Sequence, residues 1–150
     1  MIFSFQGAPE VRAPVHQVWL RLLDPQAVAH SGPGVERVEV VDAHHFKVLT
    51  ALRIGSFKIQ FTMKVELFDL IRERELKMQA KGKATGSSVE VTSRIRLEEL
   101  GPSLTRLHWE ATTEMRGVVA AVGGSRLEGL ARDLTARFRD RFVTGIEVPV

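Results

Sequence analysis

The sequence of 150 residues contains no cysteine, and it also lacks tyrosine and asparagine. Without cysteine the chain can form no disulfide, no thiolate metal site and no iron–sulfur cluster, and it has no cysteine nucleophile. No apolar run approaches the ~20 residues that a membrane-spanning helix needs. The first residues show no basic segment ahead of an apolar stretch, so a secretory signal is not expected. These absences predict a cytoplasmic globular protein.

Motifs of several enzyme classes are also missing. The sequence has no H-E-x-x-H, G-x-S-x-G or P-loop pattern. His44 and His45 are adjacent in a predicted turn, where neighbouring side chains point apart and make a poor metal clamp. His108 falls on the outer face of a predicted strand, and an inward His108 would instead favour a cyclase or a hydrolase. We therefore expect no enzymatic activity, no bound metal and no cofactor.

The charged residues do not indicate a nucleic-acid partner. Lys and Arg number 21 against 18 Asp and Glu, which gives a net charge of +3. Nucleic-acid binders usually gather basic residues on one face, whereas here acids interrupt them, as in residues 72–75 (Arg-Glu-Arg-Glu). Arg137, Arg139 and Arg141 give the end of the last predicted helix a basic character that complements its dipole. The alternative is that these arginines contact an anionic membrane or an acidic partner.

The length suits a single domain over residues 1–150. A short strand is predicted over residues 2–6, followed by a helix that begins at Pro14 and carries an apolar stripe. A second short helix begins at Pro25 with Asp24 as its N-cap and ends near His30. A long helix with an apolar stripe begins near Ser125 and closes the chain.

Between the short helices and the last helix the apolar period changes to two. Six segments alternate in this way, over residues 35–41, 46–54, 57–67, 76–82, 89–97 and 107–115. One buried face and one wet face are typical of an antiparallel sheet, and the short connections suit hairpins. With the first strand the sheet has seven strands. The apolar stripe of the last helix needs a partner, and the inner face of this sheet is the obvious one, so the fold class is α+β.

Several short segments, spread over nearly the whole chain, form a recognisable set: Pro14-Val15-His16-Gln17-Val18-Trp19 with Leu23-Asp24-Pro25, Pro33-Gly34, Ile54-Gly55 with Phe61, Gly82 with Gly86, Thr105-Arg106-Leu107 with Trp109, and Gly117 with Gly123-Gly124-Ser125-Arg126-Leu127. In their order and spacing these segments resemble the CoxG family of carbon monoxide dehydrogenase subunits. Gly32 and Val35 depart from the family, which usually has an aliphatic residue before the Pro-Gly turn and often a cysteine after it.

The resemblance implies a helix-grip fold of the START-like, Bet v 1-like (SRPBCC) superfamily. In that fold a seven-stranded antiparallel sheet wraps around a long C-terminal helix, with two short helices between strands 1 and 2. It also implies a hydrophobic cavity between sheet and helix, and a link to molybdenum-containing CO dehydrogenases and related hydroxylases. Some members carry a C-terminal extension implicated in membrane attachment. The chain ends at Val150, so this property is not carried over, and peripheral contact with the inner membrane face stays an alternative to a purely cytoplasmic location.

The predicted inner face suggests what such a cavity would bind. Thr50, Ser93 and Thr113 place hydroxyls on this face, and no strand places a charge there, which suits a neutral, largely hydrophobic ligand such as a lipid or a quinone. Small residues on the same face either leave a cavity or accommodate larger neighbours in a filled core. The residues expected to contact the ligand are Thr50, Leu52, Phe57, Phe61, Met63, Met78, Ala80, Ser93, Ile95, Trp109, Ala111, Thr113, Leu127, Leu130 and Leu134.

Three functions from different classes follow from these observations. The first is non-enzymatic binding or carriage of a hydrophobic small molecule. The second is an accessory or recruitment role for a molybdenum-containing hydroxylase, with the cavity incidental. The third is a START-like cyclase or hydrolase, for which the predicted inner face supplies no acid, base or histidine.

Overall fold

The computed structural model describes residues 1–32, 34–54, 56–122 and 124–146. The elements follow one another as β1 (Ile2–Gly7), β2 (Glu10–Val11), α1 (Val15–Leu22), α2 (Pro25–Ser31), β3 (Val35–Asp42), β4 (His45–Ile54), β5 (Phe57–Ile71), β6 (Glu75–Ala84), β7 (Ser87–Gly101), β8 (Leu104–Gly117), the 3-10 helix η1 (Val118–Val122) and α3 (Gly124–Ile146). The predicted α+β order of a strand, two helices, six strands and a long helix is confirmed. Pro33, Gly55 and Gly123, which belong to segments that resemble the CoxG family, lie outside the described residues.

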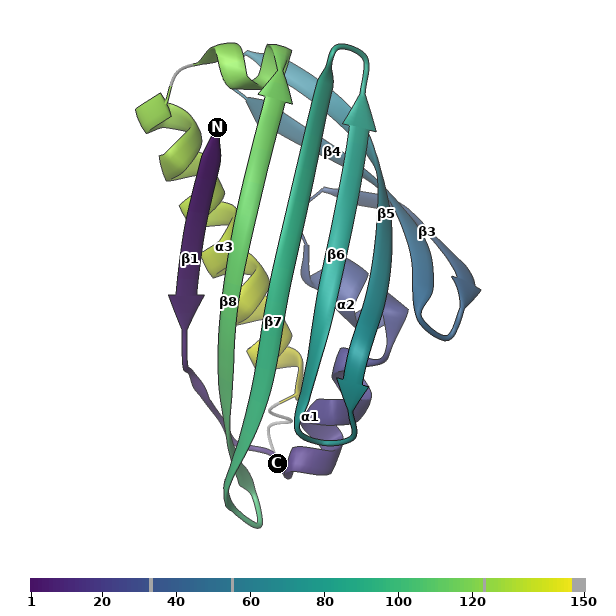
Figure 1. Cartoon of the computed structure of the whole chain (residues 1–150), viewed down its shortest axis with the longest axis vertical. Coiled ribbons are helices and arrows are strands. Elements are labelled where there is room, and N and C mark those ends of the chain that lie inside the picture. Colours follow the sequence, from purple (N-terminus) through teal and green to yellow (C-terminus); the bar gives the residue numbers. More distant parts are fainter. Residues whose placement is uncertain (33, 55, 123, 147–150) are drawn as a thin grey trace.

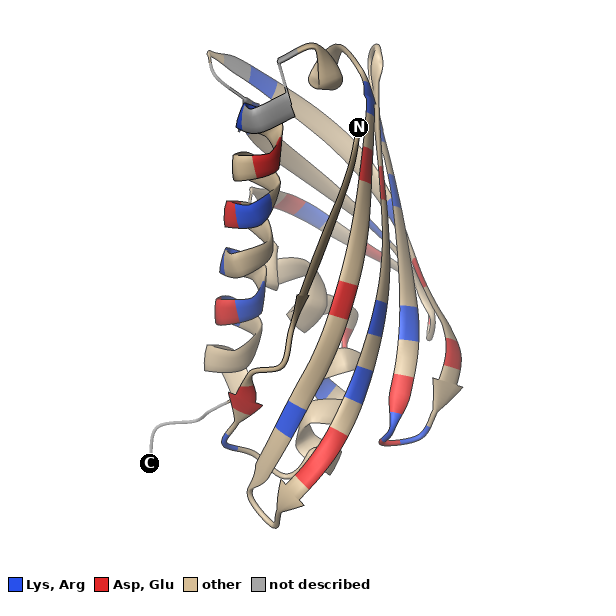
Figure 2. Ribbon diagram, turned by 60° about the vertical axis from the view of Figure 1, so that its left-hand side comes forward, with Lys and Arg blue, Asp and Glu red and all other residues tan. Residues whose placement is uncertain are grey.

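All strand pairs are antiparallel and form one sheet with the order β1-β8-β7-β6-β5-β4-β3. Strands β3 to β8 form a meander, and β1 returns the start of the chain to the edge of β8. Helix α3 runs along one face of this curved sheet, and α1 and α2 lie near its C-terminal end (Figure 1). Seen from the side, α3 stands opposite the sheet (Figure 2).

Two details differ from the sequence-based expectation. Strand β2 adds an eighth strand, which pairs with β8 through Glu10 and Val11. Two residues are too few to show an alternating pattern, so the sequence could not predict it. Pro14 is the N-cap of α1 rather than its first helical residue, because its backbone is extended (φ −60°, ψ 148°). The second short helix is as expected, since the Asp24 side chain accepts a hydrogen bond from the Gln26 backbone N–H at 3.0 Å.

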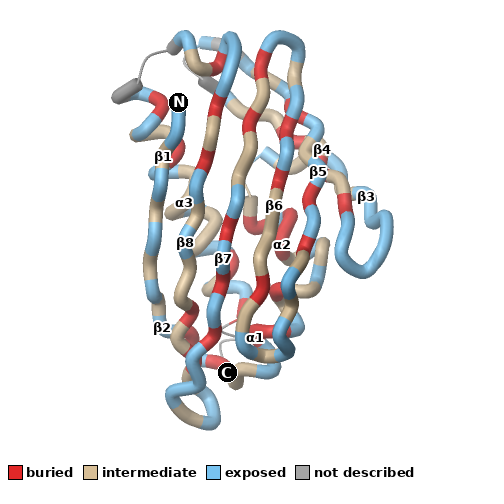
Figure 3. The backbone as a smooth tube through the Cα atoms, in the orientation of Figure 1, coloured by how far each residue is buried: buried red, intermediate tan, exposed pale blue. Residues whose placement is uncertain are grey.

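The apolar interior divides into two clusters. Buried and exposed positions alternate along the central strands (Figure 3), so each strand contributes one side to the interior. The lower cluster joins α1, α2 and the end of α3 to the sheet and includes Trp19, Leu107 and Phe142. The upper cluster gathers around Phe61 and Leu127. A cavity lies in the interior where residues of both clusters meet.

Candidate functional site

A cavity of about 310 Å³ lies between the sheet and α3. Side chains from β4 to β8 form its floor, and its other walls come from the end of α1, from α2, from the start of β3 and from residues 131–142 of α3. The volume is at the lower end of the range for pockets that bind small molecules, and such pockets are mostly apolar with a few polar groups. The interior of the sheet is therefore hollow rather than filled.

Most of the predicted contact residues line this cavity. They share the inner face of the strands, apart from one that belongs to α3: Thr50, Leu52, Phe61, Met63, Met78, Ala80, Ser93, Ile95, Trp109, Ala111, Thr113 and Leu134. Their convergence follows from the strand register, which places Met78 opposite Ser93 and Ser93 opposite Ala111 on three adjacent strands.

Three predicted residues are placed differently. Leu127 is completely buried in the upper cluster, and Leu130 packs against the same cluster, so neither lines the cavity. Both precede the part of α3 that faces the hollow. Phe57 begins β5, but its side chain lies outside the described part of the structure. Gly82, opposite Met63 on β6, leaves no space, because a Cβ there would overlap the Met63 sulfur.

The sequence did not assign several wall residues to the site. Val28 and Ala29 of α2 line the cavity, as do Phe138, Arg139 and Phe142 of α3. The apolar stripe of α3 included Phe138 and Phe142, but a helical stripe does not show which of its turns face a cavity. The contribution of α2 depends on how that helix docks, which no local pattern reveals.

Two hydroxyls on the cavity floor lack partners. The Ser93 and Thr113 side chains are both 8% exposed, and neither forms a hydrogen bond with another described residue. They lie diagonally across the β7–β8 pair, because Ser93 is opposite Ala111 and Val91 is opposite Thr113. Both hydroxyls therefore lie on the same stretch of the cavity floor, on adjacent strands. A ligand carbonyl or hydroxyl would supply the hydrogen-bond partner that both groups lack among the described residues.

The indole of Trp109 occupies the edge of the cavity next to β1. Gly7 is opposite Trp109 in the β1–β8 register, and a Cβ on Gly7 would lie 2.8 Å from the indole nitrogen. The ring therefore lies over the glycine. Its Nε1–H is buried without a hydrogen-bond acceptor among the described residues. Because this N–H lies against Gly7 of β1, the hydroxyls of Ser93 and Thr113 are better placed to form a hydrogen bond with a ligand oxygen.

Arg139 is the one ionisable residue among those that line the cavity in the described structure. Its side chain is 38% exposed, and its Nε donates to the exposed carboxylate of Asp140 at 3.1 Å. The sequence predicted no inward charge, which holds for the strands but not for the helix. A position at the border of the apolar stripe of α3 brings this arginine to the wall of the cavity.

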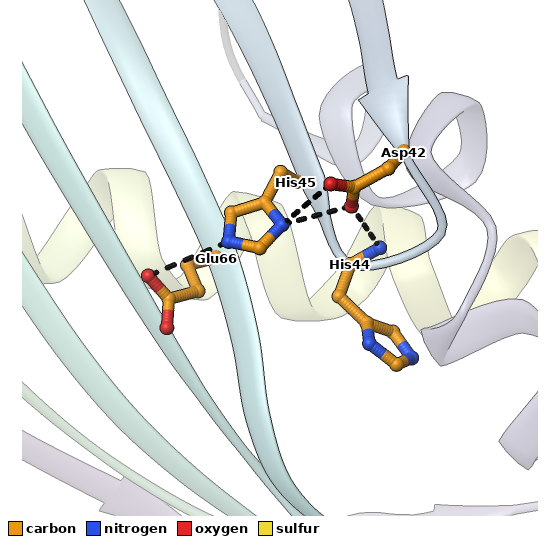
Figure 4. Close-up of polar contacts among 4 residues, drawn as sticks. All are labelled: Asp42, His44, His45 and Glu66. Atoms are coloured by element: carbon orange, nitrogen blue, oxygen red, sulfur yellow. Dashed lines mark hydrogen bonds and ion pairs between the residues drawn. The ribbon is translucent and has the colours of Figure 1, made fainter.

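The two adjacent histidines form no metal site. In Figure 4 the His44 ring points away from Asp42, His45 and Glu66. Asp42 Oδ1 accepts hydrogen bonds from the His44 backbone N–H at 2.9 Å and from His45 Nδ1 at 2.8 Å, while Glu66 lies 3.7 Å from His45 Nε2. No group of three or more His, Asp or Glu side chains in the described part of the chain is arranged to hold a metal ion.

These contacts change the pKa values of the hairpin groups. The hydrogen bond from the His44 backbone N–H, and next the one from the His45 ring, lower the pKa of Asp42. The hydrogen bond to Asp42 raises the pKa of His45. His108 lies on the outer face as predicted and bonds Glu98 Oε1 at 3.0 Å, a contact that lowers the pKa of Glu98. Asp42, His44 and His45 are exposed, and none of them lines the cavity. His108 and Glu98 do not line it either.

Comparison with known sequences gives one family. The profile of the CoxG family, which is described as a subunit of carbon monoxide dehydrogenase, matches residues 7–146. The chain belongs to the CoxG family. No curated protein matches this CoxG-family chain in sequence. In the described residues, no helix combines the length and the apolar character needed to cross a membrane.

Solved structures share the fold of this CoxG-family chain. A conserved protein from Geobacillus kaustophilus is similar with a TM-score of 0.85 and 24% identity, over 96% of this chain and 95% of that one. The ZhuI aromatase/cyclase from Streptomyces sp. R1128 has a TM-score of 0.70 and 16% identity, over 98% and 94% of the two chains. A START superfamily protein from Mycobacterium smegmatis has a TM-score of 0.70 and 13% identity, over 96% and 97%. The START-like, Bet v 1-like fold expected from the sequence is thereby confirmed.

Proposed function

We propose that this protein binds, and thereby carries, a hydrophobic small molecule in the cavity between the sheet and α3. The observation that supports this most directly is an apolar cavity of about 310 Å³ whose floor offers the unpartnered hydroxyls of Ser93 and Thr113. Apolar walls would contact the body of a lipid- or quinone-like ligand. The two hydroxyls would orient an oxygen of that ligand.

Catalysis is a weaker alternative, although one protein of similar fold is named an aromatase/cyclase. General acid–base chemistry needs an acid, a base or a histidine within hydrogen-bond reach of the substrate. Among the described residues that line the cavity there is no Asp, Glu or His. His108 lies on the outer face and is hydrogen-bonded to Glu98. The lining therefore favours binding without a chemical step.

The family description supports a second function, which concerns a protein partner. It names a component of carbon monoxide dehydrogenase, so an accessory role beside a molybdenum-containing hydroxylase is a further candidate. Affinity purification of the tagged chain from its native cells tests this role. Recovery of such a hydroxylase supports it, and recovery of the chain without one contradicts it.

Native mass spectrometry of the purified protein, before and after removal of lipid, tests the binding function. We expect a co-purified hydrophobic molecule in the first case and uptake of an apolar fluorescent probe in the second. Ala111→Phe, which fills the cavity, should abolish both, whereas Thr92→Phe on the exposed outer face of β7 should keep both. The proposal fails when the wild-type protein takes up nothing, or when Ala111→Phe, shown to be folded by circular dichroism, binds like the wild type.

A further inference from the structure

The cavity has a cationic rim where the end of α3 meets α2 and β3. Arg139 lines the cavity from α3, Gly32 lines it between α2 and β3, and Val35 lines it at the start of β3. All three are partly exposed, as are other lining residues such as Leu134, whereas Leu76 is 1% exposed. This part of the wall is therefore accessible to solvent, and it includes an arginine.

The guanidinium of Arg139 is available to a ligand. Its one acidic partner in the described structure is Asp140, the next residue along the chain, whose side chain is 69% exposed. Exposed ion pairs contribute little to stability, so exchanging Asp140 for a ligand anion costs little. A guanidinium also suits a carboxylate or phosphate geometrically, because its N–H donors form a fork that can bind two oxygens at once.

Two neighbouring arginines add positive charge at the same end of the molecule. Arg141 Nη1 lies 3.3 Å from the Gly32 carbonyl oxygen, and Arg21 Nε donates to the Phe142 carbonyl oxygen at 3.1 Å. The Arg21 guanidinium also lies over the Phe142 ring, 5.2 Å from its centroid. Both contacts hold the side chains in place without neutralising them. Positive charges near the wall of an apolar cavity attract an anionic ligand.

We infer that the ligand is an amphiphile with an acidic head group, and that Arg139 binds this head at the rim while the apolar part enters the cavity. This inference rests on the proposed binding function and names the class of ligand within it. Basic residues near the end of α3 complement the helix dipole, and both Arg137 and Arg139 do so. Only Arg139 of the two lines the cavity, which the dipole does not explain.

Decanoic acid and decanol have the same chain length and differ in the head group, so they test the acidic head alone. Isothermal titration calorimetry at pH 8 measures the binding of each to delipidated protein. We expect the wild type to bind decanoate about tenfold more tightly than decanol, as a charge-assisted hydrogen bond allows. Arg139→Gln should remove this preference by weakening decanoate binding more than decanol binding, and Arg139→Lys should restore part of it. Arg137→Gln, on the same helix, should keep the preference, and added salt should reduce it.

The results that would contradict this inference distinguish the role of Arg139 from the proposed binding function. Equal binding of acid and alcohol by the wild type, or an unchanged acid preference in Arg139→Gln, overturns the role of Arg139 and leaves hydrophobic binding intact. Absence of binding for both compounds overturns this inference together with the proposed function.

Discussion

At the scale of single residues, removal of the two hydroxyls on the cavity floor should affect ligand affinity but hardly affect stability. Ser93 and Thr113 form no hydrogen bond with a described residue, so the double variant Ser93→Ala/Thr113→Val should change the free energy of unfolding by less than about 1 kcal/mol. Its affinity for a probe that carries a carbonyl should fall about tenfold, while affinity for a hydrocarbon probe should not change. Fluorescence titration measures both affinities.

A matched pair on the opposite face of β7 controls this experiment. Ser88 and Thr92 alternate with the inner residues of the strand, so Ser88→Ala/Thr92→Val makes the same chemical changes away from the cavity. The hydroxyls have no role in recognition if both double variants bind the carbonyl probe like the wild type.

The Asp42–His45 pair allows a prediction about pH. The raised pKa of His45 means that its contribution to stability is complete below the ordinary value of 6.5 and is lost as pH rises through the folded-state pKa. The lowered pKa of Asp42 means that its contribution is complete above the ordinary value of 3.8 and is lost as pH falls through the folded-state pKa. The pair therefore stabilises the β3–β4 hairpin most between these two values.

Asp42→Asn should lower the titration midpoint of the His45 ring, because the carboxylate that raises it is removed. Proton NMR of the imidazole signals across the pH range measures the midpoint. Asp69→Asn, at another exposed ion pair, should leave it in place. A His45 midpoint that is the same in Asp42→Asn and in the wild type would show that the hydrogen bond is not formed in solution.

At the scale of elements, strands were easier to predict than the contribution of helices. Alternation is local, so the inner positions of β6, β7 and β8 could be assigned from the sequence, and most of them line the cavity. Leu127 and Leu134 belong to one apolar stripe, yet only Leu134 faces the cavity. Their difference depends on where α3 lies along the sheet. Arg139 was missed for the same reason, because the position of the cavity along α3 decides which residues at the border of the stripe reach it.

The pairing of β1 with β8 depends on a glycine that makes room for an aromatic ring. Gly7→Ala should displace the Trp109 indole, since a Cβ there would be 2.8 Å from Nε1 and Trp109 also lines the cavity. We expect a loss of about 1–3 kcal/mol in the free energy of unfolding and weaker ligand binding. In a Trp19→Phe background, the emission spectrum reports Trp109 alone.

Gly101→Ala is the matched control, because no atom lies within 4 Å of a Cβ at Gly101. It should match the parent in emission and in stability. Should Gly7→Ala match the parent as well, the indole does not rest on β1 in solution.

At the scale of the whole molecule, one interior provides both stability and binding, and the residues of α3 divide between the two. Leu127 is fully buried in the upper cluster and does not line the cavity, whereas Phe61 and Ala131 of the same cluster do. From there the cavity extends to α2 and to Phe142 of α3. A protein that gives up packing in this way must obtain its stability from the remaining core, because packing and transfer from water are what each buried side chain contributes.

Leu127→Ala and Leu134→Ala, two identical changes on one helix, test this division. Leu127→Ala should cost about 2–5 kcal/mol in the free energy of unfolding, because it opens a void in a closed cluster. Leu134→Ala only widens an existing cavity and should cost less than about 1.5 kcal/mol, while changing the affinity for apolar probes. Urea unfolding of the delipidated variants measures both losses. Equal losses would mean that the interior closes around Leu134 in solution, since only a packed site responds to truncation as Leu127 does.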